Sequence, residues 1–137
     1  MSARVGDTSR AVSANLYRLR DVAGLSLRQF SEELSERGVT ITAQSLSAIE
    51  RGRTAITVDL LTAFAAVLGV TPNVLLLPWS EDAFYPETQL YGTGPSYPRE
   101  LHEWLTGKTP LGSPAVEDRN PESIKTFRER LLPDWLR

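Results

Sequence analysis

The sequence predicts an all-α protein with five short helices in residues 1–77 and a Pro-rich, partly helical extension in residues 78–137. Three observations predict this class. Apolar residues recur at helical spacing in the first part, and no stretch there alternates with a period of two. Each apolar run in that part ends at a glycine, which readily takes the left-handed conformation that closes a helix. Eight of the nine prolines follow residue 77, so the character of the chain changes there.

The first two helices have starts and stops that the sequence marks. Thr8 or Ser9 is expected to cap a helix that ends at Gly24. Ser26 is expected to cap the second helix, because Gln29 follows three residues later and completes a capping box. Both helices carry apolar side chains along one side, which predicts that they pack into a common core.

The starts of the next three helices are also marked by capping residues. Thr42 and Thr57 are expected to cap the third and fourth helices, since each precedes an apolar run. Thr71 followed by Pro72 predicts a cap and a first-position proline for a short fifth helix that runs to Leu77. Five short helices around one core is the resulting architecture for residues 1–77.

The third helix has two different sides. At about 100° per residue, Leu46, Ile49 and Glu50 share one side. The opposite side is small and polar, and its residues are Gln44, Ala48 and Arg51. Such a side fits the DNA major groove, because glutamine matches the N6/N7 edge of adenine and a basic helix end suits phosphates. A polar outer side is also the ordinary state of any surface helix, so both interpretations stay open at this point.

Composition narrows the classes of function. The chain has a net charge of −2, no cysteine and a single histidine, His102. Disulfides, thiolate metal sites and cysteine nucleophiles are thereby excluded, and His102 is expected to be a surface residue rather than a catalytic one. No apolar run approaches the roughly 18 residues of a membrane span. We expect a cytoplasmic, nucleoid-associated protein that is not an enzyme and takes no metal, cofactor or small-molecule ligand.

Two runs of residues carry a family resemblance: Ser47-Ala48-Ile49-Glu50-Arg51-Gly52-Arg53 and Leu68-Gly69-Val70-Thr71-Pro72. With them, residues 10–77 resemble the lambda-repressor-like, Cro-type helix-turn-helix family, also called the XRE family. The resemblance implies that the third helix enters the major groove. The residues expected at base edges are Thr42, Ala43, Gln44, Ser45, Ser47 and Ala48. The residues expected at phosphates are Arg28, Arg51, Arg53 and Thr54.

One departure from the usual family pattern lies between Phe30 and Leu46, where this chain has several additional residues. It predicts a longer second helix and a wider turn over residues 33–40. The resemblance is to variants of this longer kind, which are typical of actinobacteria and their phages.

Glu50 is expected to need a cation, because it shares the inward side of the third helix with apolar residues and a lone buried carboxylate is costly. Arg20 stands at the position that pairs with this glutamate in the family. We therefore expect a largely buried Arg20–Glu50 ion pair with a structural role. The competing interpretation is that the Glu50 side chain extends into solvent.

The extension is rich in both proline and aromatic residues. Disordered segments are usually poor in aromatic residues, so residues 78–98 are expected to pack in extended form. A short helix is expected between Pro98 and Gly107, and Asn120-Pro121 predicts the cap and first residue of a second helix that ends before Pro133. The segment Gly92-Thr93-Gly94 is expected to be a turn.

These observations together favour a sequence-specific double-stranded DNA-binding repressor, resembling the immunity repressors of temperate phages. Family members bind a two-fold operator as homodimers, so a homodimer is expected here as well. The alternative is an antitoxin-like protein-interaction module that binds DNA for autoregulation, with its tail on a partner. Such tails tend to be disordered when free. An enzyme is a distant third possibility.

Overall fold

The computed structural model describes residues 5–111 and 121–136 of the chain. The chain divides into two compact units, Met1–Trp79 (unit 1) and Ser80–Arg137 (unit 2). The regular elements of the described ranges are helices, apart from an isolated antiparallel bridge between Thr88 and Ser96. The predicted all-α class is confirmed. None of the helices in these ranges is both long enough and apolar enough to cross a bilayer.

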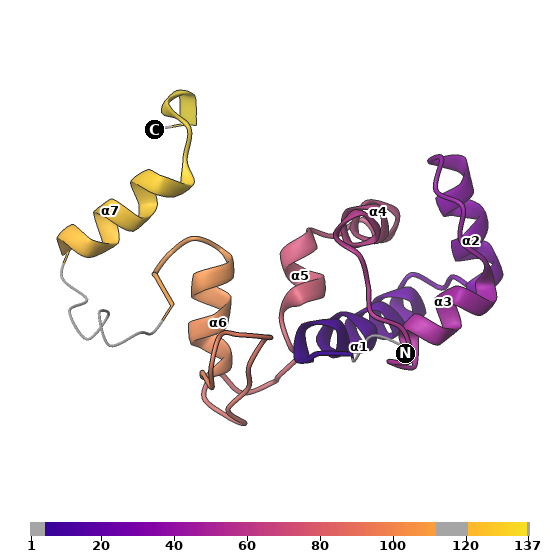
Figure 1. Ribbon diagram of the computed structural model, residues 1–137, viewed down its shortest axis with the longest axis horizontal. Coiled ribbons are helices and arrows are strands. Elements are labelled where there is room, and N and C mark those ends of the chain that lie inside the picture. Colours follow the sequence, from indigo (N-terminus) through magenta and orange to yellow (C-terminus); the bar gives the residue numbers. More distant parts are fainter. Residues whose placement is uncertain (1–4, 112–120, 137) are drawn as a thin grey trace. The chain divides into compact units, whose positions relative to one another are not determined.

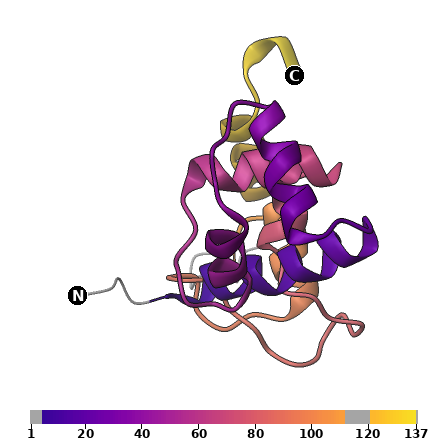
Figure 2. The same ribbon diagram turned by 90° about the vertical axis from the view of Figure 1, so that its right-hand side faces the viewer.

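Unit 1 contains five helices, which are α1 (Asp7–Val22), α2 (Leu27–Glu36), α3 (Ala43–Glu50), α4 (Val58–Leu68) and α5 (Pro72–Leu76). α1 packs against α3, α4 and α5, whereas α2 packs against α3 and α4. In Figure 1, α2 and α3 stand at an angle to each other and α4 is seen nearly end-on. Figure 2 shows α4 lengthwise. The unit is therefore built around α1, with the α2–α3 pair at one end.

The core of unit 1 consists of side chains that the helical periodicity places inward. The fully buried apolar residues are Val12, Leu16, Phe30, Leu34, Leu46, Phe64 and Leu75. The rings of Phe30 and Phe64 lie 5.5 Å apart between centroids and are tilted, which joins α2 to α4. Because this core draws on all five helices, it holds α3 in a fixed orientation.

Three of the expected helix starts are confirmed by their hydrogen bonds. Ser26 and Gln29 form the reciprocal capping box at the start of α2. Thr42 Oγ1 accepts a hydrogen bond from the Ser45 N–H at the start of α3. Thr57 Oγ1 accepts one from the Leu60 N–H at the start of α4. These caps satisfy backbone donors that would otherwise lack partners.

The expected cap of the first helix is wrong. α1 begins at Asp7 with Gly6 as its N-cap, so neither Thr8 nor Ser9 is a cap. Gly6 takes extended backbone angles and its carbonyl oxygen accepts the first helical hydrogen bond from Arg10. Asp7 explains the earlier start, because the helix dipole stabilises a carboxylate in the first turn. The Asp7 carboxylate also pairs with Arg10 at 2.8 Å.

In the described residues of unit 2, the helices are α6 (Pro98–Leu105), α7 (Pro121–Leu131) and a 3₁₀ turn, η2 (Asp134–Leu136). The short helix expected before Gly107 is confirmed, with Leu101 fully buried and His102 exposed. α7 begins at Pro121 as expected, whereas the cap predicted at Asn120 lies outside the described residues.

The segment between Pro78 and α6 is not extended, contrary to expectation. It folds as a series of turns closed by the paired hydrogen bonds of 2.8 Å between Thr88 and Ser96. Gly92 and Gly94 have φ angles of 81° and 74°, which agrees with the turn expected there. Side-chain oxygens close the turns locally, so the aromatic residues do not need an extended packing surface.

Candidate nucleic-acid interface

The connection between α2 and α3 sets where the candidate interface begins. α2 ends at Glu36, and Gly38 turns the chain with a φ angle of 82°. The Val39 N–H returns to the Leu34 carbonyl at 2.9 Å, and Ser31 Oγ donates to the Ile41 carbonyl at 2.6 Å. Both bonds tie the connection to α2. The start of α3 is consequently held in place despite the additional residues in this stretch.

α3 has the two sides that its sequence predicts. On the inner side, Leu46 is fully buried and Ile49 is 3% exposed. On the outer side, Gln44 and Arg51 are exposed and Ala48 is half-buried. The helical phase drawn from the sequence is therefore confirmed, and the polar side of α3 faces away from the core.

The polar side chains at the start of α3 differ in whether they form hydrogen bonds within the protein. Thr42 Oγ1 accepts from the Ser45 N–H and donates to Ser45 Oγ at 3.0 Å. The Gln44 amide makes no hydrogen bond to any described residue. Gln44 can thus offer a donor and an acceptor side by side, which is the pattern that recognises adenine in the major groove.

A shallow groove of about 400 Å³ runs beside the outer side of α3. It lies between α3, the connection that follows it and the start of α4. Its lining combines the hydroxyl side chains of Thr40, Thr42, Ser45, Thr54 and Thr57 with the apolar side chains of Ile41, Ala48, Ile49, Ala55 and Leu60. Hydroxyls suit phosphate oxygens and base edges, and methyl groups suit the thymine methyl. Sequence reasoning missed Thr40 and Thr57 as members of this surface.

Exposed arginines follow α3 and stand at the start of α2. Arg51 and Arg53 follow α3 directly, and both are exposed without an ion pair to any described residue. Arg28, at the start of α2, lies 3.2 Å from Glu32, but its side chain is 87% exposed. An exposed pair of this kind contributes little, so Arg28 remains able to turn toward a phosphate.

α2 carries a negative feature that the sequence analysis did not use. Glu32, Glu33 and Glu36 are all exposed on this helix. Carboxylates repel phosphate groups, whereas the guanidinium groups that follow α3 attract them. The exposed charge is therefore positive directly after α3 and mostly negative along α2.

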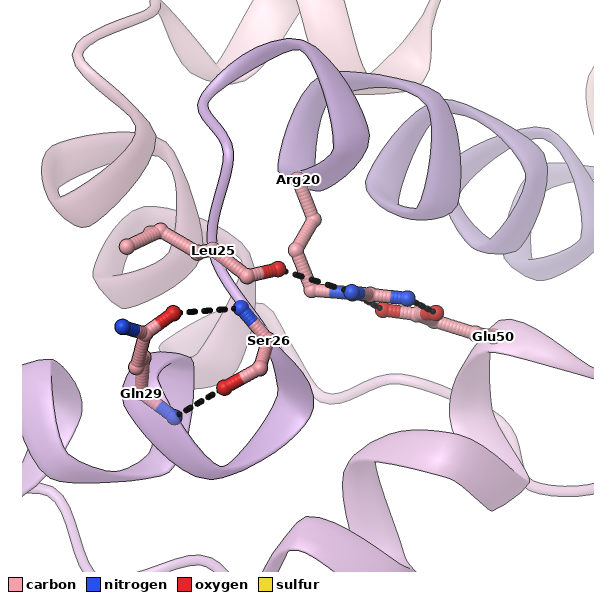
Figure 3. Close-up of polar contacts among 5 residues, drawn as sticks. All are labelled: Arg20, Leu25, Ser26, Gln29 and Glu50. Carbon is pink, nitrogen blue, oxygen red and sulfur yellow. Dashed lines mark hydrogen bonds and ion pairs between the residues drawn. The ribbon is translucent and has the colours of Figure 1, made fainter.

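Arg20 and Glu50 form a bidentate ion pair at the inner end of α3 (Figure 3). Arg20 Nε lies 2.7 Å from Glu50 Oε2, and Nη2 lies 2.8 Å from Oε1. The Glu50 side chain is only 5% exposed, which contradicts the interpretation that it extends into solvent. The hydrogen bonding of the Arg20 guanidinium to the Glu50 carboxylate raises the pKa of Arg20, against the opposing effect of burial, so the guanidinium stays charged.

The same guanidinium reaches a third element. Arg20 Nη1 donates to the Leu25 carbonyl at 2.8 Å, directly before the Ser26–Gln29 capping box (Figure 3). One side chain of α1 therefore joins the start of α2 to the end of α3. Its role is to hold the angle between the two helices of the helix-turn-helix.

Asn15 is a buried polar residue that the sequence analysis missed. It is 1% exposed, and its amide donates to the carbonyl oxygens of Leu75 and Leu77 at 2.8 and 2.7 Å. It lies between Val12 and Leu16, at an inward position of α1. This position could have identified Asn15 from the sequence, because a polar residue at an inward position needs a buried hydrogen-bond partner.

Arg18 continues this contact to the end of unit 1. Its Nη2 donates to Asn15 Oδ1 at 3.2 Å, and its guanidinium carbon lies 4.2 Å from the centroid of the Trp79 ring. Such a cation–π contact fixes the indole against α1. Pro78 and Trp79 thus fall within the helical unit, two residues beyond the change in composition at residue 77.

Comparison with protein families matches part of the chain. Residues 16–75, from the middle of α1 to α5, match the family model described as helix-turn-helix. No curated protein and no solved structure matches the chain. In the described part of the chain, no three metal-ligating side chains gather into a cluster. Residues 16–75 therefore form a helix-turn-helix domain similar to those of the XRE family, the family of lambda repressor and Cro, which is a kind of domain found in DNA-binding regulators.

Proposed function

We propose that this chain is a sequence-specific transcriptional repressor that binds double-stranded operator DNA with α3 in the major groove. The observation that carries the proposal is the outer side of α3, where an unengaged Gln44 amide lies among small side chains. The small side chains let the helix approach base edges closely. Repression follows from occupancy of a promoter, as in the phage immunity repressors that the sequence resembles. The site of action is the nucleoid, in the cytoplasm.

The residues divide into two roles under this proposal. Those that face the bases are Thr42, Ala43, Gln44, Ser45, Ser47 and Ala48, and those that contact phosphates are Arg28, Arg51, Arg53 and Thr54. The division is supported by exposure, since all four of the phosphate-contacting residues are exposed. Ala43, Ser47 and Ala48 are half-buried, so they act at close range through methyl and hydroxyl contacts rather than by reach.

The proposed functional form is a homodimer on a two-fold operator. A single domain presents only one short recognition helix, the eight residues of α3. Two copies related by a two-fold axis place their recognition helices in successive major grooves, about 34–36 Å apart. This arrangement doubles the bases that are read, and it predicts an operator with inverted half-sites.

Selection of bound sequences from random duplex DNA with the full chain tests the proposal. We expect a reproducible motif with inverted symmetry and half-site centres about one helical turn apart. Gln44→Ala, carried through the same selection, should lose preference at one position in each half-site. Recovery of unrelated sequences by both proteins would overturn the sequence-specific function, and a motif without symmetry would overturn the dimer.

An antitoxin-like module is the second candidate, favoured by the exposed aromatic residues of unit 2. Tyr91 and Trp135 are 79% and 81% exposed, and aromatic residues of this kind are enriched at protein–protein interfaces. Against it stands the hydrogen-bonded turn structure of residues 80–97, since tails of that kind are disordered before they bind. Limited proteolysis of the free protein separates the two. Rapid cleavage throughout residues 80–111 favours the antitoxin, and protection of that segment favours the repressor.

A further inference from the structure

An exposed surface on unit 2 combines aromatic rings with carboxylates. We call residues 81–97 the acidic–aromatic loop. Phe84, Tyr85 and Tyr91 are 58%, 72% and 79% exposed in it. Its charged residues are Glu81, Asp82 and Glu87, and the sequence contains no lysine or arginine between residues 54 and 98. The residues of the loop therefore present apolar area together with negative charge, and the adjoining Arg99, whose N–H donates to the Ala83 carbonyl, is paired with Glu103 at 3.1 Å.

The loop has a defined, hydrogen-bonded conformation in the absence of a partner. Ser80 Oγ donates to the carbonyl of Tyr85 at 2.8 Å, and Asp82 Oδ1 accepts from the Phe84 N–H at 2.9 Å. The rings of Phe84 and Tyr97 pack in a T-shaped arrangement with their centroids 6.0 Å apart. A loop whose backbone is already ordered loses little conformational entropy when a partner covers it.

We infer that the acidic–aromatic loop is a docking surface for a basic, arginine-containing segment of a partner protein. The carboxylates attract a positive segment, and the aromatic faces can stack with its guanidinium groups. DNA is a poor occupant, because every charge of the loop repels phosphate. The chain already contains one contact of the required kind, with the Arg18 guanidinium 4.2 Å from the Trp79 ring centroid.

The outer side of α2 provides an internal control for this inference. Glu32, Glu33 and Glu36 give it three exposed carboxylates but no exposed aromatic residue, while Arg28, which pairs with Glu32, and the following Arg37 offset part of this negative charge. A ligand that responds to carboxylates alone should therefore also bind α2. A ligand that needs the rings should select the loop.

The test is a titration of the isotope-labelled full chain, followed by NMR, with a short unstructured peptide in which arginine alternates with glycine and serine. We expect chemical-shift changes concentrated in residues 81–97. Tyr85→Leu should weaken peptide binding about threefold, and Tyr85→Phe should retain it because the aromatic face remains. Equal shifts on α2, or unchanged binding by Tyr85→Leu, would overturn the inference.

Matched variants distinguish an effect of the loop residues on peptide binding from an effect on folding or on total charge. Glu87→Gln should weaken binding of the peptide, whereas Glu122→Gln, which removes the same charge from α7, should not. Trp135→Leu removes an exposed ring outside the loop and should also have no effect. Preserved dispersion of the amide spectrum shows that each variant is folded. The inference does not depend on operator binding, so loss of DNA binding in another variant leaves this test unaffected.

A photo-reactive phenylalanine at position 85 then identifies the occupant in cells. Cross-links to a segment rich in arginine or lysine on another protein support the inference. Cross-links between two copies of this chain, or to nucleic acid, overturn it in favour of self-association or of DNA contact.

Discussion

The inner and outer sides of α3, which ends at Glu50 with Arg51 as its C-cap, differ in what their side chains contact. On the inner side, Leu46, Ile49 and Glu50 are buried among partners, and the carboxylate of Glu50 is matched by the guanidinium of Arg20. On the outer side, Gln44 and Arg51 are exposed and have no partner in the described part of the chain. Unengaged polar atoms are tolerated there because water satisfies them until a ligand replaces it.

This difference separates stability from recognition along one helix. Removal of an inner polar group leaves a buried partner unsatisfied, so it should act on folding. Removal of an outer polar group changes little in the free protein and should act on binding. Substitutions at four positions test that separation, two at polar groups buried in unit 1 and two on the outer surface.

The largest effect is expected at the ion pair. Glu50→Ala leaves the Arg20 guanidinium largely buried without its carboxylate, which should lower the free energy of unfolding by about 3–5 kcal/mol. Thermal denaturation measures the change, and Glu36→Ala on the exposed side of α2 is the control. Glu50→Gln should also lower thermal stability, with DNA binding reduced only through unfolding. A Glu50 variant with wild-type melting but no DNA binding would place this residue in the groove instead.

The next largest effect is expected at Asn15. Asn15→Ala leaves the carbonyl oxygens of Leu75 and Leu77 without their donor, and each unsatisfied buried group costs about 1–3 kcal/mol. The free energy of unfolding should fall accordingly in urea titrations. Thr62→Ala, on the exposed surface of α4, serves as the control and should change it little. If Asn15→Ala matched that control, water would have replaced the amide and α5 would not depend on it.

Gln44→Ala should leave folding unchanged and weaken binding to the selected operator by about 1–3 kcal/mol, with relaxed preference at one base pair. Fluorescence anisotropy on operator and random duplexes measures both effects. Equal losses on the two duplexes would make Gln44 a backbone contact.

Arg53→Ala should give the smallest effect, spread over all DNA sequences. Loss of one phosphate contact should reduce the slope of log affinity against log salt concentration by about one unit. Arg130→Ala, which removes the same charge from α7, should leave the slope unchanged. An unaltered slope for Arg53→Ala would remove this residue from the phosphate-contacting set.

Comparison of a fragment with the full chain tests whether unit 2 contributes to assembly or to DNA binding. Residues 1–79 retain α1 to α5 and the Arg18–Trp79 contact, so this fragment should remain helical. If unit 2 contributes to the proposed dimer, the fragment should have a lower mass in solution and bind the operator more weakly than the full chain. Equal mass and affinity would assign unit 2 to a role outside DNA binding.

Local physical chemistry accounts for what the sequence determined by itself. The caps at Ser26, Thr42 and Thr57 depend on bonds that span three residues, so they can be read directly from neighbouring letters. The two sides of α3 follow from helical periodicity alone. The predicted start of the first helix is wrong because Gly6, Thr8 and Ser9 can each serve as an N-cap. Asp7 in the first turn favours the start at Gly6.

Only the tertiary structure decided the contacts between distant residues. Asn15 meets carbonyls 60 and 62 positions away, and Arg18 meets Trp79 across a similar separation. The groove beside α3 likewise joins side chains from Thr40 to Leu60. Whether such groups meet depends on how helices pack, and packing is a property of the whole core rather than of any short run of residues. The sequence could therefore indicate the recognition helix, while the surface around it had to be seen.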